Sequence, residues 1–97
     1  MDFNSMMMQA KKMQANLNNT MKKLEETEYE GSSNGIVVKM NGKGEVLSIN
    51  IPDEVMDDRE MLQDMLLIAF NNANSSKEED REKQLGKVTG GINIPGM

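Results

Sequence analysis

The chain has 97 residues, with 11 basic and 16 acidic side chains, a net charge of −5, and neither cysteine nor histidine. This length suits one small domain, residues 1–97. The composition excludes disulfide bonds, thiolate metal sites and the usual histidine proton shuttle. No stretch approaches the roughly 18 to 20 apolar residues of a membrane span, and the N-terminus is not a signal peptide, so we expect a cytoplasmic protein that does not act at membranes.

Charge is distributed unevenly along the chain. Residues 1–24 carry four lysines and one aspartate, a net charge of +3, whereas residues 25–97 carry seven basic and fifteen acidic side chains, a net charge of −8. Screening at physiological salt weakens interactions beyond about 8 Å, so contact with phosphate depends on local charge more than on the total. The acidic composition therefore does not exclude nucleic acid as a partner of the N-terminal segment.

Residues 5–28 have the period of a long amphipathic helix, with four lysines opposite an apolar stripe. Such a helix is about 36 Å long, whereas a compact chain of this length has a radius of gyration near 13 Å. One subunit cannot cover the stripe along its whole length. We therefore predict a projecting arm that pairs with the arm of a second copy in a two-fold homodimer. The stripe consists of Phe3, Met6, Ala10, Met13, Leu17, Met21 and Leu24.

A small antiparallel sheet is predicted after this helix. Glycine, serine and asparagine interrupt the helical period at residues 29–35. Runs of β-branched and alternating apolar residues follow, and Pro52 ends the sheet. The predicted strands are a short one beginning near Glu28 and two further ones at residues 36–40 and 46–51.

The connection between the last two strands, residues 41–44, reads Asn-Gly-Lys-Gly. Asn-Gly supplies the positive backbone dihedral angles of a tight connection, so we predict a hairpin whose glycines are structural. A phosphate-binding P-loop would need G-x-x-x-x-G-K-S/T between a strand and a helix. Neither this turn nor the glycine-rich segment 86–91 has that pattern.

A second helix is predicted after Asp57-Asp58, whose negative charge suits a helix N-terminus. Apolar residues from Met61 to Phe70 surround much of its circumference, so it needs cover from the sheet and also from a partner subunit. Residues 74–76, Asn-Ser-Ser, are a predicted interruption, and residues 77–85 extend the helix beyond it. Residues 86–97 contain too many glycines for a helix and are predicted to be a flexible tail.

Five segments are specific in their order and spacing. They are residues 6–14 (MMMQAKKMQ), Glu30-Gly31, residues 38–46 (VKMNGKGEV), residues 66–73 (LLIAFNNA) and residues 86–96 (GKVTGGINIPG). Together they resemble the YbaB/EbfC family of bacterial nucleoid-associated proteins over essentially the whole chain. The resemblance implies an α+β subunit of order α-β-β-β-α that forms a tweezer-shaped homodimer. It also implies binding of double-stranded DNA with low sequence specificity at the nucleoid, with effects on nucleoid organisation and gene regulation.

Candidate DNA-binding residues lie on the first helix. Lys11 and Lys22, like Lys12 and Lys23, are eleven residues apart, so each pair lies along one line about 16.5 Å long. Two arms would present eight ammonium groups, enough to attract phosphates without reading bases. From the residues alone, a solvated face is the commoner role of such a charge run, and the resemblance reverses that preference. Amides that either add hydrogen bonds to DNA or serve as polar filler are Asn16, Asn18 and Asn19.

The apolar positions of both helices are expected to provide subunit packing and the dimer interface, because most of the methionines and leucines recur at helical spacing. Met7 and Met8 lie off the stripe and are expected to be exposed. The predicted interface residues are Met13, Leu17, Met21, Leu24, Leu67 and Phe70.

Catalysis is not expected. The carboxylates at residues 53–54, 57–58 and 78–80 lack calcium-loop spacing and a histidine-bearing metal pattern, and so small a domain offers no evident wall for an enclosed cleft. We therefore predict no cofactor, no metal and no small-molecule substrate. The competing interpretation is an acidic protein-interaction adaptor that does not bind DNA directly, in which the lysines only keep the arms soluble.

Overall fold

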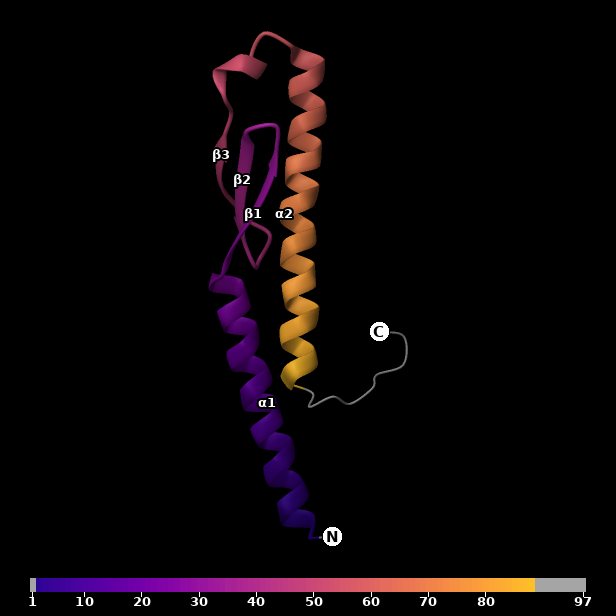
Figure 1. Ribbon diagram of the computed structural model, residues 1–97. Coiled ribbons are helices and arrows are strands. Elements are labelled where there is room, and N and C mark those ends of the chain that lie inside the picture. The colour runs from indigo at the N-terminus through magenta and orange to yellow at the C-terminus, as the bar shows by residue number, and fades with distance from the viewer. Residues whose placement is uncertain (1, 89–97) are drawn as a thin grey trace.

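The computed structural model describes residues 2–88, which form two long helices and a three-stranded antiparallel sheet (Figure 1). The strands lie in the order β1-β2-β3. This architecture confirms the predicted α+β fold class and the order α-β-β-β-α. In chain order the elements are α1 (Phe3–Glu26), β1 (Glu28–Ser33), β2 (Ile36–Asn41), β3 (Val46–Asn50), the short 3-10 helix η1 (Asp53–Val55) and α2 (Arg59–Val88).

Helix α1 starts and stops slightly earlier than the predicted 5–28, because capping residues set its ends. Asp2 is the N-cap, and its carboxylate accepts a hydrogen bond from the backbone N–H of Asn4 at 3.2 Å. At the other end Thr27 is extended, and its hydroxyl donates to the carbonyl oxygen of Lys23 at 2.7 Å. The chain can therefore enter β1 directly after the last helical turn.

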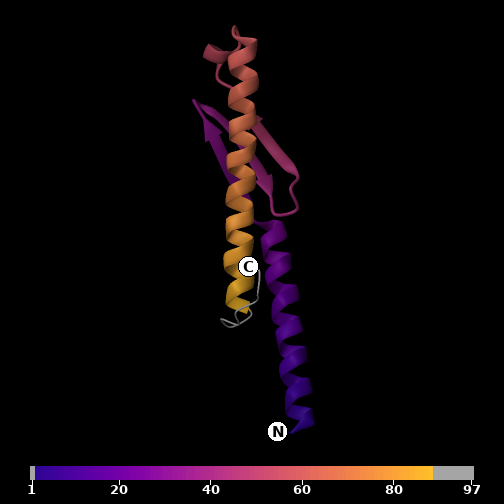
Figure 2. The same cartoon turned by 90° about the vertical axis from the view of Figure 1, so that its right-hand side faces the viewer.

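The molecule is elongated because α1 projects from the rest of it. Its longest dimension is 68 Å, and the radius of gyration is 19.0 Å, well above the roughly 13 Å of a compact chain of this size. The C-terminal part of α1 lies beside the end of α2, and the N-terminal part extends past it (Figure 2). The predicted projecting arm is confirmed.

The sheet and α2 are held together by close backbone packing. Gly31 of β1 lies against α2, where an added Cβ atom would be 2.2 Å from both the carbonyl oxygen of Ala69 and the backbone nitrogen of Ala73. Both alanines are fully buried. Three small residues thus allow a helix to approach a strand more closely than any larger side chain would permit. The surrounding core consists of Tyr29, Ile36, Val38, Met40, Val55 and Met65.

The two turns of the sheet use glycine for different reasons, and the predicted geometry of the second turn is wrong. Positive φ angles occur at both Asn34 (48°) and Gly35 (89°), in the turn that joins β1 to β2. The Asn-Gly pair with the dihedral angles of a tight turn is therefore this one, and not the pair at residues 41–42. In the 41–44 connection only Gly44 has a positive φ. Gly42 is required for space, because an added Cβ atom would lie 1.8 Å from the carbonyl oxygen of Leu24 at the end of α1.

Helix α2 is longer than predicted and is not interrupted. It runs without a break through residues 74–76 and continues through residues 86–88, which were assigned to a flexible tail. Tertiary packing overrides local propensity at both places. Ala73 is seated on β1, and Asp80 accepts hydrogen bonds from Tyr29 of β1 and from Gln84 one turn further along α2. The rest of the predicted tail, residues 89–97, lies outside the described residues.

Neither α1 nor α2, as described over residues 2–88, has the length and apolar character together that crossing a bilayer requires.

Candidate nucleic-acid interface

One side of α1 is covered by its own subunit. Leu17, Thr20 and Met21 are half-buried there, and Leu24 is only 6% exposed. Thr20 and Leu24 line a cavity together with residues of α2. Three of the positions predicted to form the dimer interface, Leu17, Met21 and Leu24, are therefore wholly or partly covered within the subunit, because α2 extends far enough to reach them.

The opposite side of α1 carries the lysines predicted to bind phosphate. At about 100° per residue, their mean direction lies roughly 170° from the mean direction of the four positions that face α2. All four lysine side chains are exposed, and no acidic residue occurs between Phe3 and Leu24. The result is an unbroken cationic face on the free side of the helix. It comprises Lys11, Lys12, Lys22 and Lys23.

The N-terminal half of α1 is uncovered all round. Every residue from 2 to 16 is exposed, including Phe3 at 72%, Met8 at 70% and Met13 at 42%. The outer part of the apolar stripe thus remains open in the isolated subunit. This agrees with the expectation that one subunit cannot cover the whole stripe.

Several predicted DNA-binding residues meet the end of α2 in a shared groove. This groove has a volume of about 380 Å³. Asn16, Asn19 and Lys23 line it from α1, and Lys87 lines it from α2. The other lining residues are Thr20, Gln84 and Val88, so no acidic side chain belongs to the wall. Lys87 was not among the predicted site residues, because treating residues 86–88 as a tail gave it no fixed position.

An exposed cationic helix and a groove of ammonium, amide and hydroxyl groups are suited to a polyanion. The sequence model of the YbaB/EbfC DNA-binding family matches residues 1–92. This chain belongs to that family. The predicted family is confirmed, and with it the predicted function at the level of DNA binding; the adaptor alternative receives no support. The YbaB/EbfC family is described by DNA binding and not by a catalytic activity.

Similar proteins cover nearly the whole chain. A protein named nucleoid-associated protein from Alkaliphilus metalliredigens is 50% identical over 99% of this chain and 88% of its own length. Another so named, from Clostridium novyi, is 46% identical over 100% of this chain and 89% of its own length. The crystal structure of an uncharacterized protein from Helicobacter pylori has a TM-score of 0.77 at 25% identity, covering 92% of this chain and 98% of that one. The YbaB/EbfC assignment and the fold are therefore supported independently.

In this member of the YbaB/EbfC family, a hydrogen bond to one carboxylate joins the start of β1 to α2, close to the base of α1. The Tyr29 hydroxyl donates to Asp80 at 2.5 Å, and the Gln84 amide donates to the other oxygen of Asp80 at 3.2 Å. Burial, together with the hydrogen bond and charge of Asp80, raises the pKa of Tyr29 to about 12. The hydrogen bond from Tyr29 is the main cause that lowers the pKa of Asp80. Because Tyr29 follows α1 closely in the chain, this contact fixes the point from which the arm projects.

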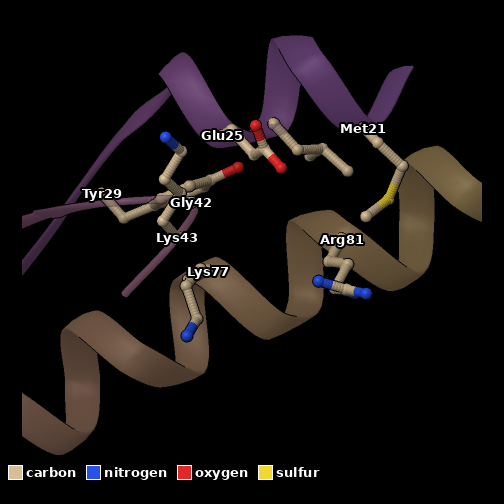
Figure 3. Close-up of a pocket in the computed structure, with 8 residues that line it drawn as sticks. Met21, Glu25, Tyr29, Gly42, Lys43, Lys77 and Arg81 are labelled. Atoms are coloured by element: carbon tan, nitrogen blue, oxygen red, sulfur yellow. The ribbon is translucent and has the colours of Figure 1, made fainter. Parts of the chain in front are cut away.

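A cavity of about 290 Å³ lies at the same junction (Figure 3). Glu25 of α1 lines it on one side and Lys77 and Arg81 of α2 line it on the other, with the 41–44 turn contributing Gly42 and Lys43. Three elements that are distant in sequence therefore meet here. The direction of α1 is set by the sheet and by α2 together.

A second open surface lies on the sheet, because α2 covers only part of one face. In the described residues α2 packs across β1 and β2 and does not approach β3. Ile49 of β3 is paired with Val38, so both side chains point to the α2 face, yet Val38 is fully buried and Ile49 is 46% exposed. On α2, Leu67 is 63% exposed and Phe70 is partly buried. We call Ile49, Leu67 and Phe70 the β3–α2 ledge.

Proposed function

We propose that this protein is a nucleoid-associated protein that binds duplex DNA with little sequence preference, through the cationic faces of two α1 helices in a homodimer. Its place is then the nucleoid, where it would influence DNA organisation and gene expression. Relatives at 50% and 46% identity that are named nucleoid-associated proteins support this assignment. The observation that carries it is the cationic face of α1.

The chemistry of that face suits phosphate and not base recognition. Lysine ammonium groups are point charges that attract backbone phosphates irrespective of sequence. Each phosphate neutralised contributes a slope of about −0.9 to the dependence of log affinity on log salt for duplex DNA. Four lysines on each of two arms therefore contribute at most roughly −7 to the slope.

The proposal of a homodimer is supported by apolar side chains that remain exposed in one subunit. The uncovered third of the sheet exposes Ile49, and a helix from another copy would complete the cover there. Leu67 lies roughly 140° around α2 from Asn72, whose amide donates to Ser32 of β1 at 3.1 Å, so Leu67 faces away from the β1 edge. Leu67 also lies roughly 160° around α2 from Ala69, which packs on β1, so its exposed side chain is on the free side of the helix and open to a second copy. Met13 and the rest of the outer stripe of α1 provide a second candidate contact.

The test is DNA binding by fluorescence anisotropy over a salt series, with two unrelated duplexes. In one variant Lys11, Lys12, Lys22 and Lys23 are all changed to glutamate. We expect at least about a 100-fold loss of affinity at 0.1 M salt, since eight attractive contacts per dimer become repulsive. Both duplexes should bind the unmodified protein with similar affinity and similar slope.

The matched control changes the net charge equally on other elements. It carries Lys39→Glu, Lys43→Glu, Arg59→Glu and Lys83→Glu, all at exposed positions outside α1. Its affinity should fall by less than about tenfold, because screening limits the reach of distant charges. Equal losses in the two variants would show that overall charge, and not the α1 face, governs binding. Absence of binding by the unmodified protein at low salt would refute the proposed function.

A further inference from the structure

The groove between the end of α2 and the middle of α1 has a chemical character unlike the rest of this acidic protein. Its lining residues carry two ammonium groups, three side-chain amides and one hydroxyl, and no carboxylate. Lys23 of α1 and Lys87 of α2 belong to it although they are 64 positions apart in sequence. This convergence depends on α2 remaining helical through residues 86–88.

The carboxylate that is hydrogen-bonded to the groove residue Gln84 is already engaged. Asp80 accepts hydrogen bonds from Tyr29 and from Gln84, and the positive charges of Lys83 and Lys87 are among the causes that lower its pKa. The backbone carbonyl groups at the end of α2 disfavour an anion, and Lys87, placed in the last turn, offsets their partial negative charge. Lys87 is therefore the group on which the anion affinity of the groove depends.

We propose that this groove binds a backbone phosphate of duplex DNA, so that α2 contacts the DNA as well as α1. Lys23 and Lys87 provide the charge, and Asn16 and Asn19 donate hydrogen bonds to the phosphate oxygens. The inference rests on the proposed function and adds the side of α1 on which the DNA lies. DNA lies against the flank of the cationic face that borders α2, and not symmetrically over that face.

The arrangement of α1 provides a sharp test of this direction. Asn16 and Asn18 are both exposed, and each lies roughly 80° from the mean lysine direction, on opposite flanks. Asn16 lines the groove, whereas Asn18 accepts a hydrogen bond from Gln14 at 3.1 Å on the far flank. Asn16→Asp and Asn18→Asp introduce the same charge with the same shape. A symmetric cationic face predicts equal effects of the two changes.

We expect Asn16→Asp to weaken duplex binding about tenfold at 0.1 M salt and Asn18→Asp less than about threefold, because only the first places a carboxylate beside the bound phosphate. In a second pair, Lys87→Gln should make the salt slope shallower by about 1.8, since each dimer carries two copies of Lys87, and Lys83→Gln should leave it unchanged. Far-ultraviolet circular dichroism establishes that all four variants are folded.

The outcomes separate this inference from the proposed function. Equal effects of the two aspartate variants together with an unchanged slope for Lys87→Gln would overturn the groove while the unmodified protein still bound DNA with a steep salt dependence. A larger effect of Asn18→Asp would place the DNA on the opposite flank and would also overturn it. Failure of the unmodified protein to bind DNA would refute the proposed function and this inference together.

Discussion

The N-terminal half of α1 and the contact between β1 and α2 differ in how strongly packing restricts the choice of residue. Every residue from 2 to 16 is exposed, so the arm tolerates many side chains provided that the helix and its charge are kept. At the other contact, Gly31 lies against Ala69 and Ala73 at a distance that excludes even one added methyl group. The lysines of the arm are exposed and take no part in the core, whereas the tightly packed contact between β1 and α2 contains only uncharged residues. DNA affinity and folding stability should therefore be separable by substitution.

The helical conformation of the projecting part of α1 also depends on what lies around it, because no other element of the subunit packs against it. An isolated helix of about 13 residues is marginal in water. In this arm the helix is propagated from the anchored base and capped by Asp2 at the tip. A partner arm or bound DNA would add to its stability.

The largest expected effect on folding is that of Gly31→Ala. The new Cβ atom would meet backbone atoms of Ala69 and Ala73, which cannot move aside as a flexible side chain would. We expect a loss of about 3 kcal/mol or more in the free energy of unfolding, measured by urea denaturation. The charge of α1 is unchanged, so any loss of DNA binding should follow the loss of folded protein.

The control for this change is Gly86→Ala, on the same helix as the two alanines. Among residues 2–88, nothing outside the adjoining turns of α2 lies within 4 Å of the Cβ position there, and alanine favours helix over glycine. A gain of about 0.5 to 1 kcal/mol is expected. If both glycine substitutions proved neutral, the close approach of β1 to α2 would be wrong.

A second comparison uses neighbouring apolar residues on α2. Leu67→Asp places a charge on the β3–α2 ledge and should shift the dimer to monomer by at least about tenfold in the dissociation constant, because burying an unpaired carboxylate is costly. Ile68 is 49% exposed but points roughly 100° away around the helix, so Ile68→Asp should leave the dimer intact. Sedimentation equilibrium of both variants checks this. Dissociation by Ile68→Asp alone would place the interface on the other side of α2.

The order of the elements and the projecting arm could be predicted because both follow from local patterns. The period of residues 5–28 exceeds what a small domain can cover, and alternating strands punctuated by glycine indicate a sheet. The length of α2 could not be predicted this way. Asn-Ser-Ser at residues 74–76 and Gly86 are weak helix formers, and only contacts with β1 and α1 keep the helix intact.

The same limit applies to the candidate site. The lysines of α1 could be selected from the sequence because charge and helical period occur together within one segment. Lys87 could not, because its position beside Lys23 exists only once α2 has reached residue 88. Likewise, the cover that α2 gives to Leu24 within the subunit depends on the length of α2 and could not be predicted from the sequence.

An effect smaller than that of Gly31→Ala is expected at the junction between the two regions. Tyr29→Phe removes the hydrogen bond to Asp80 and should lower the free energy of unfolding by about 1.5 kcal/mol at pH 7, the usual scale for a bond to a charged group. The cationic face is not altered, so the DNA affinity of the folded variant should change by less than about threefold.

The pH dependence of that difference identifies its origin. The pKa of Tyr29 is raised from 10.0 to about 12 on folding, so its contribution is complete below about pH 10 and is lost as the pH rises toward 12. The pKa of Asp80 is lowered from 3.8, so its contribution is present above that value and is lost as the pH falls below it. The difference in stability between the unmodified protein and Tyr29→Phe, measured by urea denaturation, should therefore be constant between about pH 5 and 9 and shrink at both extremes. No difference between the two proteins at any pH would mean that Tyr29 stabilises the junction through its ring alone, and that the arm is not anchored by the bond to Asp80.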